Sequence, residues 1–441
     1  MDPIKLSKQK ILLGVGDTLI IILSINGAYL IRMKQSAIKC LGLYHTFWVT
    51  LVFVLVFFIS FFLFRLYDTE ENFRSLRFLS LILGSLVLSA ILSAVVFYVF
   101  PFLMGRGVYA ITMVLVGTLA ALWRVLFFSF FKAVVPQRNV LLVGEGRPAA
   151  VIESLVTNNP EYKVIGRVKD LDSLENIIQE HPVDDIVIIA DLSPHKALNH
   201  TLDSCQKKGV NIYDMPAFYE HLTKKVPVFF INDKWFLYHK SFGKLGSRAY
   251  HRVKRVVDIA ASFVLSVLLI PLGLLIAFGI KVSSKGPVFY KQARLGKDFK
   301  KFNLLKFRTM VKDAEKENPR WTEKEDPRIT VVGRVLRRFR LDEIPQFVNI
   351  LRGDMSLIGP RPEREHFTTE LIEKIPHYSF RLSVKPGLTG WAQANYQYGS
   401  SVEESVEKLR YDLFYIKNMS LFLDFWIVLK TIQTIFFGKG R

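Results

Sequence analysis

Two adjacent carboxylates, Asp342 and Glu343, are the residues of this chain whose types and spacing best suit chemistry. They follow a basic cluster within residues 337–362, and this stretch ends in Gly359-Pro360-Arg361-Pro362, a rigid turn that presents another guanidinium. Guanidinium groups beside carboxylates indicate a site that holds phosphate and a metal ion together. We therefore expect Asp342 to carry the chemistry.

A purely structural explanation exists for the same carboxylates. Asp342 suits the N-cap of a short helix, and Glu343 and Pro345 suit its first turn. The neighbouring arginines suit a solvated face, which is the usual place of a charge run. On this interpretation the segment begins a helix and carries no chemistry.

Cations from several other segments favour the functional interpretation. Lys306 and Arg308 belong to an extended segment, and because side chains alternate there, both are expected on one side. Arg334, Arg337 and Arg338 are spaced to share one face of a helix. Each has a structural explanation when taken singly. Cations from several segments around one acidic pair predict a diphosphate substrate.

Length and composition indicate a membrane protein with more than one domain. The chain has 441 residues, which is too many for a single core, and half of them are hydrophobic. Its net charge of +20 predicts anionic partners such as lipid headgroups or phosphorylated substrates. No nucleic-acid motif occurs, so no nucleic-acid partner is expected. Cys40 and Cys205 form no metal-ligand pattern and imply no disulfide framework.

Four apolar stretches near the N-terminus are each long enough to cross a bilayer as a helix: 11–31, 44–64, 78–104 and 108–131. If the N-terminus is inside the cell, eight basic residues flank the spans on the cytoplasmic side and four flank them on the outer side. This asymmetry favours a cytoplasmic N-terminus. We therefore expect everything after residue 132 in the cytoplasm. Asp17 and Arg124 lie within spans and are expected to pair inside the bundle or to reach an interface.

From about residue 137 the pattern is that of an α/β domain. Strands at 139–143, 163–168 and 185–190 are separated by helical patterns, which predicts βαβ units. Gly144-Glu145-Gly146-Arg147-Pro148-Ala149 matches a dinucleotide fingerprint, but the acidic partner is missing unless Asp170 supplies it. A Rossmann-like spacer or regulatory module is preferred, and nucleotide binding stays open.

A fifth apolar run, residues 259–280, differs from the first four. Basic residues flank both ends and Pro271 lies in the middle, where it is expected to kink the helix. This favours a re-entrant membrane helix over an ordinary crossing or a buried core helix. Lys254, Arg255 and Asp258 share one helix face and are expected to form a charge cluster at the membrane interface.

The last third, about 254–438, resembles the monotopic polyprenyl-phosphate phosphoglycosyl transferases, or bacterial sugar transferases. The matching stretches are 254–258, 306–310, 341–346, 353–362 and 385–393. The spans and the Rossmann-like middle resemble the family's long form. The predicted fold is a multidomain membrane protein: a four-helix transmembrane bundle (1–135), a Rossmann-like α/β domain (136–236), and a mixed α/β catalytic domain (237–441) with a re-entrant helix at 256–282. One departure is Ile270-Pro271, where the family often has Ser-Pro.

The resemblance implies a two-step exchange. Asp342 attacks the sugar-linked phosphate of a UDP-sugar and expels UMP, and undecaprenyl or another polyprenyl phosphate then takes the phospho-sugar. Mg²⁺, held by Asp342 and Glu343, and the phosphate-binding cations assist; the family pattern assigns that role to Lys306, Arg308, Arg337 and Arg361. The implied location is the bacterial inner membrane, with soluble domains in the cytoplasm. The implied task is the first membrane step of exopolysaccharide, capsule or O-antigen synthesis.

Two alternatives predict other outcomes. A nucleotide-sensing regulatory membrane protein would have no transferase activity. A polytopic transferase would form no covalent intermediate, but it would build its site among many spans, whereas this acidic pair lies in the soluble part. The identity of the sugar and a homodimer formed through the bundle or the middle domain both stay open.

Overall fold

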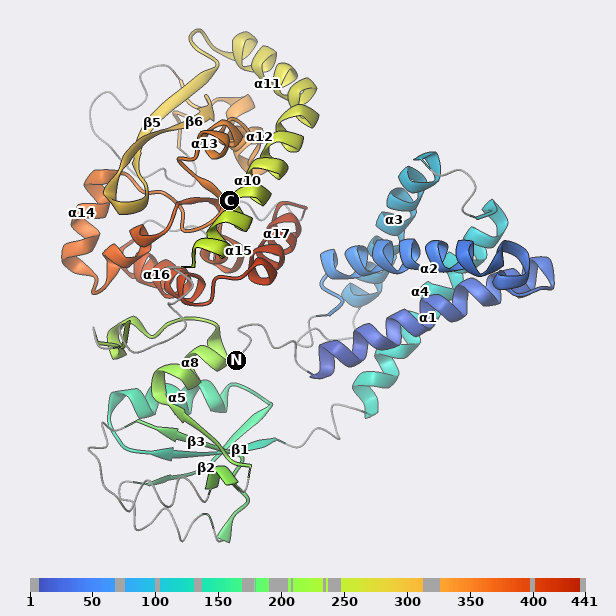
Figure 1. Cartoon of the computed structure of the whole chain (residues 1–441), viewed down its shortest axis with the longest axis horizontal. Coiled ribbons are helices and arrows are strands. Elements are labelled where there is room, and N and C mark those ends of the chain that lie inside the picture. Colours follow the sequence, from blue (N-terminus) through green and yellow to red (C-terminus); the bar gives the residue numbers. More distant parts are fainter. Residues whose placement is uncertain are drawn as a thin grey trace. The chain divides into compact units, whose positions relative to one another are not determined.

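The structure is a computed structural model of the 441-residue chain (Figure 1). It describes residues 8–67, 76–99, 104–130, 137–168, 178, 180–189, 205–207, 209–232, 235–236, 247–311, 326–396 and 401–436. The chain forms two compact units, one of residues 2–136 and one of residues 137–441. Each is described by itself.

The first unit contains four apolar helices: α1 (Lys8–Met33), α2 (Ala37–Leu63), α3 (Leu76–Val99) and α4 (Arg106–Phe130). Each is long and apolar enough to cross a membrane. The outward-facing side chains include Leu19, Leu83 and Val114, each more than half exposed, which suits a surface that faces lipid tails. The prediction of four apolar spans is confirmed, with ends shifted by a few residues.

Asp17 and Arg124, the two charged residues that the sequence analysis placed within the spans, form an ion pair. Arg124 donates hydrogen bonds from Nη1 and Nη2 to the two carboxylate oxygens of Asp17, both at 2.9 Å. Neither side chain is exposed, and the guanidinium lies 4.8 Å from the ring centroid of Phe61. This confirms pairing inside the bundle. The pair joins α1 to α4, since both charges would be costly if left alone in an apolar setting.

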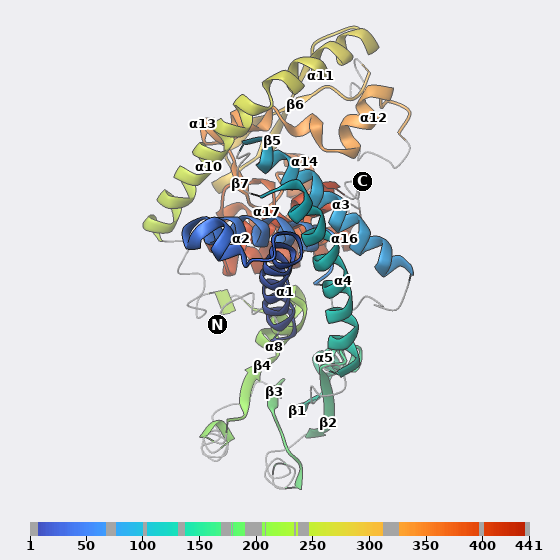
Figure 2. The same cartoon turned by 90° about the vertical axis from the view of Figure 1, so that its right-hand side faces the viewer.

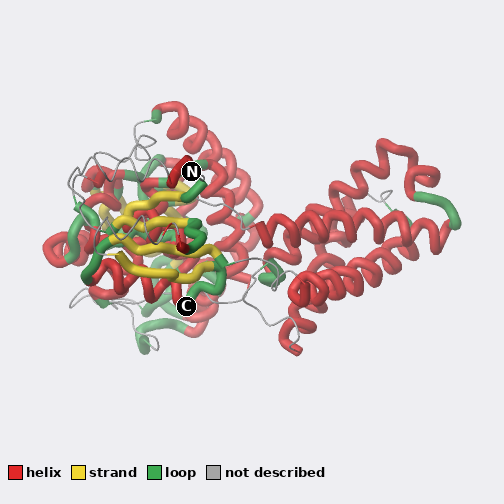
Figure 3. Tube along the Cα trace, turned by 90° about the horizontal axis from the view of Figure 1, so that it is seen from below, coloured by secondary structure: helices red, strands yellow, loops and turns green. Residues whose placement is uncertain are grey.

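The second unit begins with a four-stranded parallel sheet in the order β2-β1-β3-β4 (Figure 3). Its strands are β1 (Arg138–Val143), β2 (Tyr162–Val168), β3 (Asp185–Ile188) and β4 (Asn211–Asp214), with helices α5 (Arg147–Thr157) and α8 (Met215–Thr223). The first three strands were predicted from the sequence. The sequence analysis missed β4, which is short and only partly buried.

Alternate residues of β1 face opposite sides of this sheet. Val140 and Leu142 pack with α5 and α8, whereas Leu141 and Val143 pack on the other face. Parallel sheets need both faces covered, and the buried run of β1 meets that need. Asp170, which was predicted to be the only acidic partner for a nucleotide, lies outside the described residues.

A broken helix follows at 248–283. It consists of α10 (Arg248–Leu268) and α11 (Ile270–Ser283), which follow one another in Figure 2 and whose change of direction is visible in Figure 1. The two helices are bent by 60° at Leu269. Pro271 lies in the first turn of α11, where its missing N–H is tolerated. The prediction of a break in this run is confirmed, although the proline lies two residues after the bend and not at its centre.

The rest of the chain folds around this helix as a mixed α/β domain. Its strands are β5 (Phe289–Leu295) and β6 (Lys301–Phe307), which are antiparallel, and β7 (Ser356–Ile358) and β8 (Gly387–Thr389), which are parallel. Its helices and helical turns are η3 (Lys297–Phe299), α12 (Val331–Arg338), η4 (Leu341–Glu343), α13 (Gln346–Arg352), α14 (Glu365–Lys374), η5 (Tyr378–Ser383), α15 (Trp391–Asn395), α16 (Val402–Lys417) and α17 (Leu421–Phe436).

The sheet domain contacts this C-terminal part through α8 and α16. Lys417 of α16 donates hydrogen bonds to both carboxylate oxygens of Glu220 in α8, at 2.7 and 2.9 Å, and both side chains are buried. Lys225 forms a further ion pair with Glu407. These contacts attach the sheet domain to α16.

Candidate active site

The acidic pair lies on the short helical turn η4, between α12 and α13. Both carboxylates are buried, each residue being 7% exposed. Arg340, just before the turn, has a left-handed backbone with a φ of 54°. Such conformations are rare for residues other than glycine and occur often at functional sites. The reversal at Arg340 places η4 against both α12 and β6.

The capping interpretation of Asp342 is not supported. The helix that follows, α13, begins at Gln346 with Pro345 at its N-cap, and no side chain caps it. The Asp342 side chain therefore does not satisfy the first turn of α13. Among the described residues, no side chain donates a hydrogen bond to this carboxylate.

Glu343, in contrast, is held by two of the predicted phosphate-binding cations. Arg361 donates a hydrogen bond from Nη2 to Glu343 Oε1 at 2.8 Å. The Lys306 ammonium of β6 lies 3.7 Å from the same oxygen. The structure thus brings together residues from β6, η4 and the Gly-Pro-Arg-Pro turn.

Arg337 reaches the site from the last turn of α12. Its Nε donates a hydrogen bond of 2.8 Å to the hydroxyl of Thr309, just after β6. Gly333, on the same helix, has the Thr309 backbone where a Cβ would stand, so glycine permits the close approach. The positive charge of Arg337 acts on Asp342 and lowers the pKa of its carboxyl group. The sequence analysis did not single out Thr309.

Thr309→Val is expected to reduce kcat/KM about tenfold. The substitution removes the acceptor that orients Arg337, and a hydrogen bond to a charged group contributes roughly 1.5–3 kcal/mol. The measurement is the rate of the transfer reaction that the family resemblance implies, alongside a thermal unfolding midpoint. An unchanged rate in a folded variant would show that Arg337 does not depend on Thr309.

The protonation of the two carboxyl groups is driven in opposite directions. Burial raises the pKa of Asp342; Lys306 opposes this and the adjacent Glu343 carboxylate adds to it. Burial also raises the pKa of Glu343, but Arg361, Lys306 and Arg340 outweigh it and hold that pKa below its usual range. Burial lowers the pKa of Lys306 to about 8. Glu343 is therefore the member of the pair that keeps its negative charge to lower pH.

The donor set fits Mg²⁺ only together with substrate. No cluster of three or more His, Cys, Asp or Glu side chains suited to a metal occurs in the described part of the chain. Mg²⁺ is often bound by one or two carboxylates plus substrate phosphates. Asp342, which accepts no hydrogen bond from a described side chain, suits that arrangement, whereas Glu343 Oε1 already faces two cations.

Arg308 lies apart from this cluster. Its Nη2 donates hydrogen bonds to the Ser284 carbonyl and hydroxyl oxygens, at 2.8 and 2.9 Å, just after α11. Strand β6 ends at Phe307, so the alternation that was predicted to place Arg308 beside Lys306 stops one residue early. The structure uses Arg308 to join the end of the broken helix to the strand that carries Lys306.

The predicted interfacial charges attach α10 to the folded domain. Lys254 donates to Asp424 of α17 at 2.7 Å, and Arg255 donates to the carbonyl oxygens at the end of α13, including that of Leu351 at 2.8 Å. Asp258 accepts a hydrogen bond of 3.1 Å from the Leu357 backbone in β7. All three thus bind different elements of the domain that carries the acidic pair.

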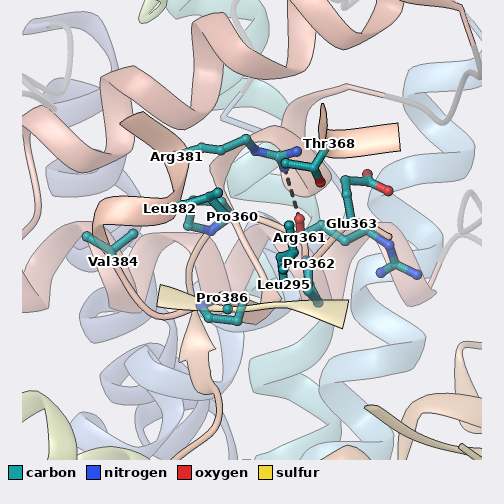
Figure 4. A pocket seen from close by; sticks show the side chains of 11 residues that line it. Leu295, Pro360, Arg361, Pro362, Glu363, Thr368, Arg381, Leu382, Val384 and Pro386 are labelled. Carbon is teal, nitrogen blue, oxygen red and sulfur yellow. Dashed lines mark hydrogen bonds between the residues drawn. The ribbon is translucent and has the colours of Figure 1, made fainter. Parts of the chain in front are cut away.

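A small cavity lies beside the Gly-Pro-Arg-Pro turn (Figure 4). It has about 10 Å³ of space, roughly enough for one water molecule. Arg361 and the buried Arg381 both line it, and the Arg381 guanidinium bonds the Arg361 carbonyl oxygen. The sequence analysis missed Arg381, because a lone arginine in a helical turn carries no signal of its own.

The last part of the chain matches a known protein family. Residues 249–438 match the family model described as "Bacterial sugar transferase". The matched region contains every element of the site, from the broken helix to α17.

Individual proteins with similar sequences have names of the same kind. An Aeromonas hydrophila UDP-N-acetylgalactosamine-undecaprenyl-phosphate N-acetylgalactosaminephosphotransferase is 39% identical over 54% of this chain and 55% of its own length. A Caulobacter vibrioides UDP-glucose:undecaprenyl-phosphate glucose-1-phosphate transferase is 40% identical over 41% of this chain and 69% of its own. The exopolysaccharide production protein ExoY of Sinorhizobium fredii is 38% identical over 42% and 87%. The chain thus spans about half the length of the Aeromonas relative.

Proposed function

Because this chain belongs to the bacterial sugar transferase family, we propose that it transfers a sugar 1-phosphate from a UDP-sugar to a polyprenyl phosphate. The products are UMP and a polyprenyl-diphospho-sugar. The observation that carries this proposal is the buried Asp342–Glu343 pair, which lies among Lys306, Arg337 and Arg361. A regulatory protein without activity has no need of such a charged cluster.

The first half of the reaction forms a covalent intermediate on Asp342. A carboxylate oxygen attacks the sugar-linked phosphorus of the UDP-sugar, and the bond to the bridging oxygen breaks, so UMP leaves with that electron pair. Like charges oppose the attack. Arg337, which acts electrostatically on Asp342, and Lys306 reduce this repulsion. Mg²⁺, if held by Asp342 and the diphosphate oxygens, would neutralise charge on the transferring phosphate.

The second half releases the intermediate. A phosphate oxygen of the polyprenyl phosphate attacks the same phosphorus, and the Asp342 carboxylate is the leaving group. Arg361 holds Glu343 ionised, so that Glu343 orients cations at the site and does not protonate the intermediate. The balance is one phosphoryl bond broken and one formed in each step.

The broken helix brings this site to the lipid. We propose that α10 and α11 enter the membrane and return, because α11 exposes Leu274, Leu275 and Phe278, each 68–71% exposed. Helix α17, with Phe422 and Phe425 exposed, would lie along the interface. The sheet domain would be Rossmann-like and cytoplasmic, and the bundle would anchor the enzyme in the inner membrane. The reaction would start a repeat unit of exopolysaccharide, capsule or O-antigen.

The test uses the full-length protein in membranes with a panel of UDP-sugars and undecaprenyl phosphate. We expect UMP release and a sugar-labelled lipid diphosphate with one or a few of the donors, which would also identify the sugar. A parallel reaction without lipid phosphate checks that the lipid product needs its acceptor. Absence of UMP release with every donor would contradict the proposal.

A further inference from the structure

The Gly-Pro-Arg-Pro turn that presents Arg361 is held in place by hydrogen bonds to its backbone carbonyl oxygens. Two of its residues, Pro360 and Pro362, have no N–H, so the turn offers few donors of its own. The carbonyl groups of Pro360, Arg361, Pro362 and the following residue, Glu363, instead accept hydrogen bonds from three other segments: β5, η5 and β8. The pairs are Pro360 O with Gly387 N (2.9 Å), Arg361 O with Arg381 Nη2 (2.9 Å), Pro362 O with Arg294 Nη1 (3.3 Å) and Glu363 O with Leu295 N (3.1 Å).

Arg381 is the donor in this set that is both charged and buried. It is 6% exposed, and its position is fixed by two partners besides the turn. Its Nη2 lies 3.1 Å from Asp412 Oδ2 on α16, and its Nη1 donates to the Tyr378 hydroxyl. Asp412 is 2% exposed. A buried guanidinium with three fixed partners is a rigid support, because each bond restricts the plane of the fork.

A continuous line of contacts therefore runs from α16 to the acidic pair. Asp412 holds Arg381, Arg381 holds the Arg361 carbonyl oxygen, and the Arg361 side chain bonds Glu343. Figure 4 shows the middle link, from the Arg381 guanidinium to the Arg361 backbone. Each link is a charge-assisted hydrogen bond of 2.8–3.1 Å.

We propose that Arg381, supported by Asp412, is a positioning residue that sets where the Arg361 guanidinium lies relative to Glu343. Arg381 itself touches neither the reacting atoms nor the acidic pair. This inference deepens the proposed transferase function and, for its kinetic effect, rests on it. A misplacement of about 1 Å in a charged catalytic group reduces a rate by as much as 10²-fold.

A double-mutant cycle tests whether Arg381 acts through Arg361. The paired substitution Arg381→Gln with Asp412→Asn removes both buried charges and leaves neither unpaired. We expect it to lower kcat about 10- to 100-fold and to add little loss in the Arg361→Ala background. Losses that multiply in full would show that Arg381 acts independently of Arg361. If the paired variant does not fold, Arg381→Lys replaces it in the same cycle.

Hydrogen exchange provides a readout that does not depend on catalysis. In the paired variant, amide exchange of residues 356–363 is expected to become faster, while exchange in the strands of the sheet domain stays the same. Unchanged exchange in the turn would overturn the inference whether or not the enzyme is active. Absence of UMP release by the unmodified protein would contradict the proposed function alone.

A matched control lies on the same helix. Glu220→Gln with Lys417→Met removes another buried ion pair that involves α16, but Lys417 bonds α8 and not the turn. We expect this control to leave exchange in residues 356–363 unchanged and its effect to multiply with that of Arg361→Ala. If the control and the Arg381 variant showed the same non-additivity with Arg361→Ala, the effect would come from a general loosening of α16. That result would contradict the proposal.

Discussion

Asp342→Asn is expected to reduce UMP release by on the order of 10⁴-fold or more, the size of loss seen when a nucleophile or its direct partner is removed. The amide keeps the size of the side chain but cannot attack phosphorus or leave as a carboxylate. Burial of Asp342 makes the result informative, because water has limited access to replace it. The measurement is a single-turnover assay with the UDP-sugar donor.

The matched control is Asp298→Asn. Asp298 is exposed and has a left-handed backbone, with φ of 54°, which asparagine also adopts readily. We expect the control to keep full activity. Mass spectrometry of the rapidly quenched unmodified protein, mixed with donor but no lipid phosphate, should show a phospho-sugar on a peptide that contains Asp342. An active Asp342→Asn protein, or an adduct elsewhere, would rule out the covalent mechanism assigned to this residue.

Arg361→Ala is expected to lower kcat/KM by roughly 10²- to 10³-fold, as for loss of one preorganised charged donor. Arg361 also gives the largest of the effects that oppose burial and hold the Glu343 pKa low. Arg361 also lowers the pKa of Asp342, so its removal raises the pKa of both carboxyl groups, and each becomes protonated at a higher pH than in the unmodified protein. The acid limb of the kcat/KM profile should therefore move toward neutral pH, and activity above that limb should remain low.

Arg352→Ala serves as the control for this variant. Arg352 is an exposed cation at the end of α13, so its removal lowers the net charge equally without touching Glu343. We expect the acid limb of the kcat/KM profile of Arg352→Ala to stay where it is in the unmodified protein. A reduced rate for Arg361→Ala with an unshifted profile would mean that neither Asp342 nor Glu343 determines the acid limb.

Local patterns were enough to predict most elements of the fold. The four N-terminal helices, the strands β1 to β3 and the break before Pro271 follow from hydropathy, alternation and proline chemistry, which act over neighbouring residues. Strand β4 was missed because it has only four residues, three half-buried and one exposed, and so short a segment carries little periodicity. Its place is decided by pairing with β3, a contact between segments that are far apart in the chain.

The candidate site divides in the same way. The residue types alone identified Asp342, Glu343, Lys306, Arg337 and Arg361 as a group, because carboxylates among cations have a chemical meaning in any order of the chain. The sequence placed Arg308 with them and overlooked Arg381. Strand β6 ends one residue before Arg308, and Arg381 supports the site only through a backbone carbonyl oxygen. Neither the end of β6 nor the contact of Arg381 can be predicted from neighbouring residues.

The sequence by itself determined that this protein has apolar spans, a broken apolar helix and one acidic pair among cations, since composition and short-range spacing encode these properties. Only the tertiary structure decided the partners: Arg361 and Lys306 on Glu343, Thr309 on Arg337, and Asp412 behind Arg381. The physical reason is range. Hydropathy and backbone preference act between neighbours, whereas hydrogen bonds and charges act across the few ångströms that folding closes between distant segments.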